Sequence, residues 1–398
     1  MAVAVSSVGN VSTPRPNSYP SWIDTAIANG WIENTWCTIA GASPTHSLSA
    51  TNTCYAVAPS DHASRGDQSG VMKAWCGGAF AKLLGTFGSF ITMGGGHGDY
   101  QGNEVYRFDV DTRTWTRLSD PYPTDGDFTG LTTGWWPADG AQVNGSPASI
   151  HTNQMVLCHP RRNSFWTFFG QTDSGSANAN PLAGEFCLST NIWSQRGTNP
   201  GTTALEGFSA YDSRRDVFFY HGGGSTHLFT HNVVSDTYTE YNPSNDSVLQ
   251  ISYSVADYDY NNDMIAVVNP NDSNLYGITP SAPATTVVNL TTSGKPTITG
   301  QGGFGWSASL DAFYWHNGTS TDVYRVKKGY GPWQSATYTW TSMTSGSNAV
   351  TPESNEANGV FSKFQVIDYI GCTIAIMVRR TGLTGAGAVY AFLLKAPS

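Results

Sequence analysis

A short apolar strand that runs into glycine recurs along this chain and limits the fold more than any other feature. The clear copies are residues 89–96, 164–170 and 216–224, and the weaker copies are 264–269, 312–318 and 372–378. Each is preceded by one strand and followed by a second. Five of the six units then have a last strand, which carries an aromatic before Ser or Thr in four of them, as at Trp115 and Trp193. Four short strands in a unit of about 45–50 residues are typical of a β-propeller blade. The predicted fold is therefore all-β, a propeller of four-stranded antiparallel blades.

The two chain ends predict how the ring closes. Complete units end at Trp115, Trp193, Tyr238, near Val288 and at Trp340. Residues 359–394 then supply three strands without a fourth, and residues 34–38 have the fourth-strand pattern with no blade before them. Pairing the N-terminal strand with the C-terminal three would remove two exposed sheet edges. We predict six blades, with seven as the alternative if residues 37–75 contain a further blade.

The chain is predicted to be a single domain over residues 1–398, because no Pro-rich or Gly/Ser-rich linker separates dissimilar regions. An N-terminal arm covers residues 1–33. The expected blades are 70–119, 148–196, 205–242, 250–291, 303–344, and 356–395 completed by 34–40.

Residues 94–115 read Gly-Gly-Gly-His-Gly-Asp-Tyr-Gln-Gly-Asn-Glu-Val-Tyr-Arg-Phe-Asp-Val-Asp-Thr-Arg-Thr-Trp. This stretch resembles a kelch repeat of the galactose-oxidase-like β-propellers, with its glycine pair, Tyr106 and Trp115. Residues 147–152 and the strand that ends at Gly170 are similar to the next blade of that family. The resemblance covers the whole chain as architecture and is specific over about residues 86–240. It implies the propeller fold but no single function, because such propellers include oxidases, polysaccharide lyases, and glycan-binding or protein-binding modules.

Composition narrows the class of partner. Charged residues make up 12% of the chain, the aromatic content is 13% and the formal net charge is −9. These values exclude a coiled coil and a disordered chain, and they argue against nucleic acid as a partner. No stretch approaches 18 apolar residues and residues 1–11 lack a basic segment and a long apolar segment, so neither membrane insertion nor a signal peptide is expected.

The six cysteines show no metal-binding spacing. We expect most to be buried thiols, with one disulfide among Cys37, Cys54 and Cys76. His227 and His231 lie close in sequence, but no carboxylate or cysteine completes a ligand set with them. No metal and no cofactor are therefore predicted.

Long connections gather at one corner of the predicted ring. In an up-and-down blade, the loop after the second strand and the link to the next blade lie on the same face. Residues 38–70 and 120–149 are such links, and they flank the loop at 94–103 and lie near the loop at 171–183. Long loops in a compact fold are more often functional than merely connecting. This corner is the predicted site.

The corner carries residues of two chemical kinds. The candidate catalytic residues are His97, Tyr100 and His151, and the candidate ligand-binding residues are Asp99, Asn103, Trp135, Trp136 and Arg65. A His or Tyr base beside an Arg that neutralises a uronate would suit β-elimination, and adjacent tryptophans can stack on sugar rings. Structural roles stay open: the histidines can bond a neighbouring blade, the Asp and Asn can organise the glycine-rich turn, and the tryptophans can fix the loop.

Two functions follow. The first is a propeller outside cells or on a virion surface that binds polysaccharide or a surface glycan, including a bacteriophage tail or structural component in contact with other virion proteins. The alternative is a carbohydrate-active enzyme, a lyase of acidic polysaccharide that uses His97, Tyr100 and His151. Binding requires only aromatics and loops, whereas catalysis also requires a defined geometry, so we favour the first, and whether the protein is an enzyme stays open.

Overall fold

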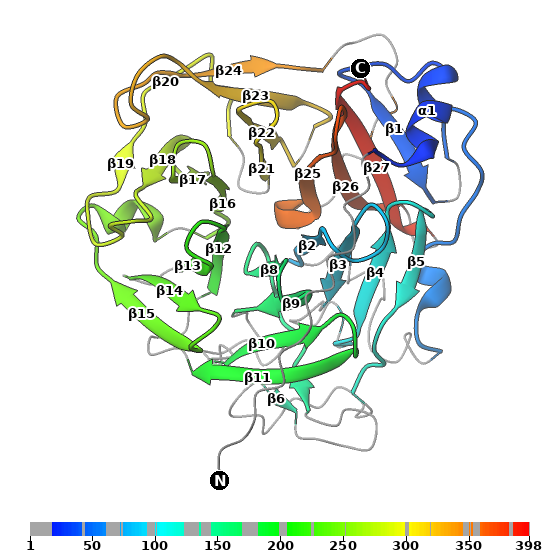
Figure 1. Cartoon of the computed structure of the whole chain (residues 1–398), viewed down its shortest axis with the longest axis horizontal. Helices are drawn as coiled ribbons and strands as arrows, with labels where there is room; N and C mark the ends of the chain where they lie inside the picture. The colour runs from blue at the N-terminus through cyan, green and yellow to red at the C-terminus, as the bar shows by residue number, and fades with distance from the viewer. Residues whose placement is uncertain are drawn as a thin grey trace.

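The computed structural model shows a propeller. It describes residues 18–41, 44–60, 72, 75–93, 100, 102–122, 135–136, 145–168, 182–198, 205–223, 227–250, 252–298, 302–318, 320–344, 350, 352, 359–381 and 385–397. Six antiparallel sheets of four strands surround a central axis, and one of them gains a fifth short strand (Figure 1). The predicted fold and number of blades are confirmed.

The blades follow one another along the chain. Blade 1 comprises β2 (Gly78–Ala81), β3 (Ser89–Met93), β4 (Val105–Asp109) and β5 (Thr114–Arg117). Blade 2 comprises β8 (Val156–His159), β9 (Ser164–Thr167), β10 (Leu182–Cys187) and β11 (Ile192–Thr198). Blade 3 comprises β12 (Leu205–Asp212), β13 (Val217–Gly223), β14 (Leu228–Asn232) and β15 (Thr237–Tyr241).

Blades 4 to 6 complete the ring. Blade 4 comprises β16 (Val255–Asp259), β17 (Met264–Asn269), β18 (Asn274–Ile278) and β19 (Val288–Asn289). Blade 5 comprises β21 (Gly303–Ser307), β22 (Ala312–His316), β23 (Val323–Lys328) and β24 (Tyr338–Ser342), and β20 (Thr292–Ser293) pairs with β24 in parallel. Blade 6 comprises β25 (Phe364–Asp368), β26 (Thr373–Thr381), β27 (Gly385–Lys395) and β1 (Trp36–Ala40).

The N-terminal strand closes the ring as predicted. β1 pairs antiparallel with β27, with Trp36 opposite Phe392. Helix α1 (Ser21–Ala28), which the sequence analysis did not predict, packs beside this blade (Figure 1). Trp22 is buried, and its indole N–H donates to the carbonyl of Val110 in blade 1 at 2.8 Å. The arm therefore joins the last blade to the first.

A five-residue turn between the first and second strands recurs in blades 2 to 5. In blade 3, Asp212 accepts main-chain N–H bonds from Arg214 and Arg215 at 2.9 and 3.1 Å, and Asp216 ends the turn at φ +61°. Asp tolerates this left-handed backbone better than most residues do. The equivalent first residues are His159, Asp259 and Ser307, and the equivalent last residues are Asn163, Asp263 and Asp311. We call the side of the ring that carries these turns the turn face and the opposite side the loop face.

The same turns join neighbouring blades through polar pairs. His159 Nε2 lies 2.8 Å from Asp216 Oδ1, and Arg215 holds both carboxylate oxygens of Asp263 at 2.7 and 2.6 Å. Asn261 donates to Asp311 at 2.8 Å. Side-chain bonds thus connect blades 2 to 5 on the turn face, and in each pair the acceptor is the aspartate that ends the turn.

The rest of the ring is held by apolar and thiol side chains between the blades. All six cysteines are free, so the disulfide expected among Cys37, Cys54 and Cys76 is wrong, and four of the six thiols are buried.

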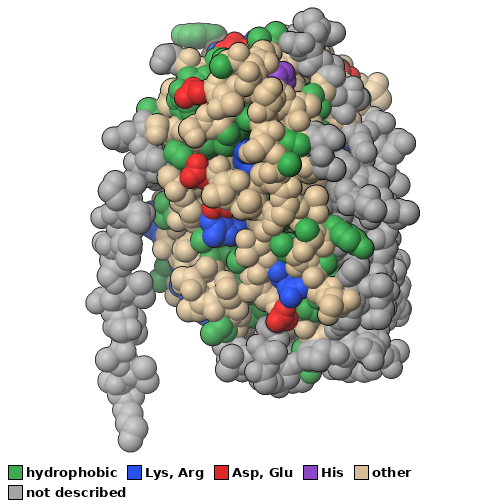
Figure 2. Space-filling model, turned by 90° about the vertical axis from the view of Figure 1, so that its right-hand side faces the viewer, with side chains coloured by type: hydrophobic (Ala, Val, Ile, Leu, Met, Phe, Trp, Pro, Cys, Tyr) green, Lys and Arg blue, Asp and Glu red, His purple; other side chains and the backbone are tan. Residues whose placement is uncertain are grey.

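The side of the ring seen in Figure 2 is mainly polar or main-chain surface with scattered hydrophobic and charged side chains. Among the described helices, none is long and apolar enough to cross a membrane.

Candidate functional site

A pocket of about 520 Å³ lies on the propeller axis. The innermost strands of all six blades (β2, β8, β12, β16, β21 and β25) contribute to its wall, together with the turns that follow several of them. Because Lys82, Pro160 and Ser213 of those turns line it, the pocket opens toward the turn face. Its volume falls in the range of about 300–1,000 Å³ that is usual for ligand sites. We call it the axial pocket.

One side of the axial pocket is aromatic. Tyr211 comes from blade 3, Tyr258 and Tyr260 from blade 4, and Trp306 from blade 5. Tyr260 is half exposed at the rim, where the guanidinium of Arg214 lies over its ring at 4.7 Å. Trp306 is partly buried and packs against Phe313 with ring centroids 4.6 Å apart. Three consecutive blades therefore present aromatic rings to the same space.

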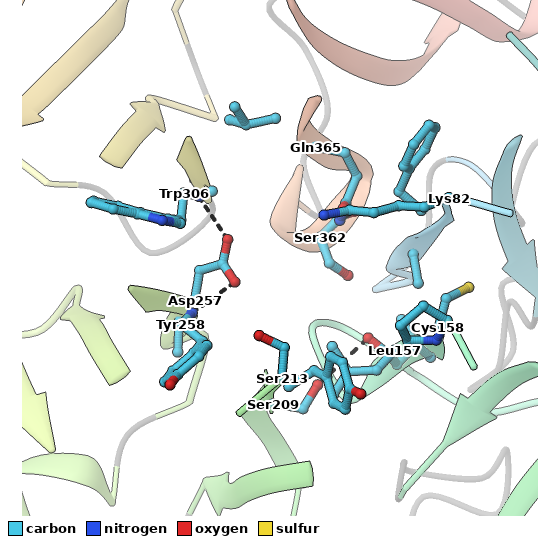
Figure 3. Close-up of a pocket in the computed structure, with 18 of the residues that line it drawn as sticks. Lys82, Leu157, Cys158, Ser209, Ser213, Asp257, Tyr258, Trp306, Ser362 and Gln365 are labelled. Atoms are coloured by element: carbon cyan, nitrogen blue, oxygen red, sulfur yellow. Dashed lines mark hydrogen bonds between the residues drawn. The ribbon is translucent and has the colours of Figure 1, made fainter. Parts of the chain in front are cut away.

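On the opposite side of the axial pocket, polar side chains lie among apolar residues of blades 1 and 6 (Figure 3). Lys82 reaches in from blade 1, and Ser362 and Gln365 come from blade 6. The hydroxyl of Ser362 accepts the N–H of Gly78 and donates to the carbonyl of Asn153, both at 3.1 Å. These bonds join blades 6, 1 and 2, so the ring itself sets the position of Ser362.

Asp257 is the carboxylate of the inner wall. Its Oδ2 accepts the N–H of Trp306 in blade 5 at 2.6 Å, and its Oδ1 accepts the N–H of Tyr258 at 2.8 Å (Figure 3). Burial raises the pKa of Asp257 to about 6, against the lowering effect of these bonds and of Lys82. The pocket thus contains an acid whose charge changes near neutral pH.

Aromatic rings close the axis at the loop-face end. Trp75 stacks on Tyr253 with centroids 4.9 Å apart, and it also lies 6.3 Å from Phe361 and 6.0 Å from His151. These four residues come from blades 1, 4, 6 and 2, just before the innermost strand of each. We call them the axial aromatic cluster. None of the four lines the axial pocket, whose wall begins with the innermost strands that follow them.

Two members of the axial aromatic cluster have an unusual backbone. Tyr253 has φ +70° and Phe361 has φ +47°, in the left-handed region that favours glycine. A bulky residue there costs about 1–2 kcal/mol. Such strain persists only where the surroundings fix it, and here the stacked rings from four blades do so.

The structure gives two of the predicted site residues internal partners. Tyr100 is fully buried and its hydroxyl donates to Glu104, while Ser149 donates to its carbonyl at 2.8 Å. Asn103 is also buried, and its side-chain amide donates to Ser146 Oγ and to the carbonyl of Pro147, each at 2.8 Å. These contacts tie the loop of blade 1 to the link before blade 2. The chemical roles expected for Tyr100 and Asn103 stay predictions.

The remaining predicted residues are only partly placed. His151 is buried in the axial aromatic cluster, where its ring lies 6.0 Å from that of Trp75. Trp135–Trp136 form the short strand β6, paired with β7 (Ser146–Pro147), and their side chains are outside the described part. Arg65, His97 and Asp99 also lie outside the described residues. The site at this corner stays a prediction.

The sequence reasoning missed the axial pocket because it looked for long loops. The pocket lies on the face of short turns, which also carries the Arg-Arg pairs at 161–162 and 214–215. Arg161 lines the pocket and Arg215 pairs with Asp263. The signal that could have found this face is the recurrence of Asp or Asn four residues after His159, Asp212, Asp259 and Ser307.

Sequence comparison finds no relative of this chain. No protein-family model matches the chain, and no curated protein matches it in sequence. The structure itself shows the propeller fold.

Proposed function

We propose that this chain is a saccharide-binding β-propeller and that the axial pocket holds the sugar. The observation that carries the proposal is the two-sided lining of that pocket. Tyrosine and tryptophan rings line one wall, and Lys82, Ser362 and Gln365 lie among apolar residues of the other. Sugar rings have apolar faces that pack on aromatics and hydroxyl edges that need hydrogen-bond partners, so a lining of this kind suits them.

The site would be preformed. Gln154 in the pocket wall donates to the carbonyl of Ala256 at 2.6 Å and accepts its N–H at 2.5 Å, which joins blade 2 to blade 4. Ser209 of blade 3 donates to the carbonyl of Gln154 at 2.5 Å. A wall that is already ordered loses little conformational entropy when a ligand binds, which favours affinity.

We further propose that the chain belongs to the kelch or galactose-oxidase-like propellers. Blade 1 supports this, because Tyr106 lies in its third strand and Trp115 in its fourth. The Trp115 indole donates to the carbonyl of Gly387 in blade 6 at 2.9 Å, so this residue joins two blades. A recurring pattern position that bonds to the neighbouring blade is what a blade repeat is expected to contain. This contact supports the family proposal and says nothing about the ligand.

Retention on a glycan array tests the binding function. We expect wild-type protein to be retained on at least one class of glycan and Tyr260→Ala to weaken retention, because loss of a stacking ring costs about 0.5–1.5 kcal/mol, roughly threefold to tenfold in affinity. Tyr330→Ala is the matched control, since Tyr330 is fully exposed on blade 5, away from the pocket lining. Unfolding curves of both variants should overlay that of the wild type.

A second variant separates the axial pocket from the predicted corner. Trp135→Ala combined with Trp136→Ala removes the tryptophan pair of the loop face. If that double variant loses retention and Tyr260→Ala keeps it, the sugar binds at the corner and the pocket assignment is wrong. No retention of wild-type protein on any glycan would overturn the binding function itself.

The alternative function, a lyase of acidic polysaccharide, stays a prediction. It needs His97, Tyr100 and His151 in one accessible cleft. Tyr100 is fully buried and His151 is 3% exposed, so neither supports this arrangement. Incubation with uronate polymers, followed by ultraviolet absorbance of unsaturated products, tests it. We expect no absorbance increase; an increase that His151→Ala abolishes would establish the enzyme.

We also propose that the protein acts outside cells, on a virion surface or in another extracellular setting. The low share of charged residues, at 12%, supports a surface of neutral polar groups that suits contact with glycans. Mass spectrometry of purified virions and of cleared culture medium would test the location. Recovery only inside intact cells would contradict it.

A further inference from the structure

We propose that the axial pocket selects a sugar that carries a carboxylate, with Lys82 receiving this carboxylate and Asp257 opposing it when ionised. The inference rests on the saccharide-binding function proposed above and names its ligand class. It is carried by the two charged groups that face each other across the pocket (Figure 3).

Lys82 supplies the cation. It follows β2 directly, and Figure 3 shows its side chain extending into the pocket with the nitrogen toward the interior. Within the described part of the chain, its ammonium makes no hydrogen bond or ion pair. An ammonium with three donors and no acceptor offers strong bonds to a carboxylate. Lys82 is therefore available to a ligand.

The other cations near the rim are engaged. Arg161 lies 3.4 Å from Asp216 Oδ2, and Arg214 stacks on Tyr260 and donates to its carbonyl. Each of these guanidinium groups already has a partner in the turn face. The positive charge that a ligand inside the pocket would meet is accordingly that of Lys82.

The carboxylate at the rim, Asp368, is also engaged. It accepts bonds from the hydroxyls of Ser307 and Ser309 at 2.6 and 2.7 Å and from the N–H of Ala308 at 2.8 Å. These donors hold its negative charge on the turn of blade 5. Asp257 is different, because it accepts two main-chain N–H groups inside the pocket wall and faces Lys82.

The charge of Asp257 sets the pH range of binding. Its pKa is raised to about 6 by burial, is lowered by Lys82 and is raised further by Asp259. Cys158 and Tyr211 also line the pocket, and burial raises the pKa of both, so they stay neutral at this pH. Below pH 6 a ligand carboxylate meets Lys82 and a neutral acid. Above pH 6 it also meets an anion.

Matched polymers test the ligand class. Polygalacturonate, alginate and hyaluronate, each paired with its carboxyl-reduced form, are immobilised together with neutral glycans, and retention is measured at pH 5.0 and 7.5. We expect the native uronates to be retained more strongly than their reduced forms at pH 5.0, with a smaller difference at pH 7.5. A free carboxylate has a pKa of about 3–4 and stays ionised at both values.

Two variants test the residues. Lys82→Met should weaken retention of the uronates about threefold to fivefold without affecting neutral glycans, as expected for one partly exposed ion pair. Lys327→Met is the control, because Lys327 is an exposed lysine on β23, and it should leave retention unchanged. Asp257→Asn should make retention equal at the two pH values. If this variant does not fold, the pH dependence of the wild type still decides the point.

The outcomes separate this inference from the function on which it rests. Equal retention of native and reduced polymers, or retention of neutral glycans alone, would overturn the carboxylate preference and leave saccharide binding in place. Unchanged retention in Lys82→Met would overturn the role of Lys82. Absence of retention on every polymer, charged or neutral, would instead count against saccharide binding as a whole.

Discussion

Different interactions hold the two ends of the propeller axis together. At the loop-face end, Trp75, Tyr253 and Phe361 pack ring against ring, and two of them have a left-handed backbone. At the turn-face end, polar residues of short repeated turns bond from blade to blade, as Arg215 does with Asp263. The first end is irregular and apolar, and the second is repeated and charged.

This difference indicates where a ligand can act without unfolding the ring. Rings that fill the axis and hold strained backbones are coupled to the packing of four blades, so a change there alters the whole fold. The pocket walls near the turn face are fixed by main-chain bonds, such as those accepted by Asp257, and their remaining side chains can change chemistry locally. We therefore expect large stability effects at one end and large binding effects at the other.

The largest expected effect is at Phe361, which is fully buried. Phe361→Ala removes a core ring and should lower the free energy of unfolding by about 3–5 kcal/mol, measured by urea titration. Because φ at this position is +47°, Phe361→Gly should be more stable than Phe361→Ala by about 1 kcal/mol, the reverse of the usual order. Tyr330→Ala is the exposed control. Equal stability of the Gly and Ala variants would show that the backbone relaxes when the ring is lost.

The blades could be predicted from sequence because each repeats the same pattern of short strands with alternating buried side chains. The strand that contains Phe218 and Tyr220, and its counterpart that contains Phe313 and Trp315, alternate buried side chains between two blade interfaces. Ring closure followed from a missing strand at one end and an extra strand at the other. Helix α1 was not predicted. It is only eight residues long, and its apolar residues Trp22 and Ile23 are buried only because the helix packs on the closed ring.

The pocket could not be predicted in the same way. Lys82, Asp257 and Ser362 are about 100 to 280 positions apart in the chain and meet only because each lies at the innermost strand of a different blade. No local pattern marks them, and the turn residues nearest them are the polar residues expected in any exposed turn. The sequence also could not show that Tyr100 and Asn103 are buried, since both lie in a glycine-rich loop.

A smaller effect is expected from the turn-face bonds. Arg215→Met leaves Asp263 without its two charged bonds and Asp212 without its bond at 2.7 Å, which should cost about 2 kcal/mol of unfolding free energy. The Arg215 bond lowers the pKa of Asp263 below its ordinary value of 3.8. The stabilisation is therefore present above that value and is lost as pH falls through the lowered pKa. Added salt should reduce the difference, unlike that of Phe361→Ala.

The neighbouring arginine provides the control for that experiment. Arg214 is exposed and stacks on Tyr260, so Arg214→Met should change the unfolding free energy by less than about 0.5 kcal/mol. A difference between Arg215→Met and wild type that stays constant from pH 7 to pH 3 would mean that packing, and not the ion pair, joins blades 3 and 4.

The last expected effect is confined to the pH dependence of stability and concerns Asp257 in the pocket wall. Its pKa is raised from 3.8 to about 6, so the folded wild type binds a proton more tightly than the unfolded chain does and loses stability as pH rises from 4 to 6. Asp257→Asn has no such titration. Its unfolding free energy relative to wild type should therefore rise by about 2 kcal/mol over this interval, and urea titration at pH 4, 5, 6 and 7 measures it. A constant difference across the series would mean that Asp257 stays ionised in the folded protein. The pocket would then present a fixed negative charge opposite Lys82, and the pH dependence of uronate binding would have to come from another group.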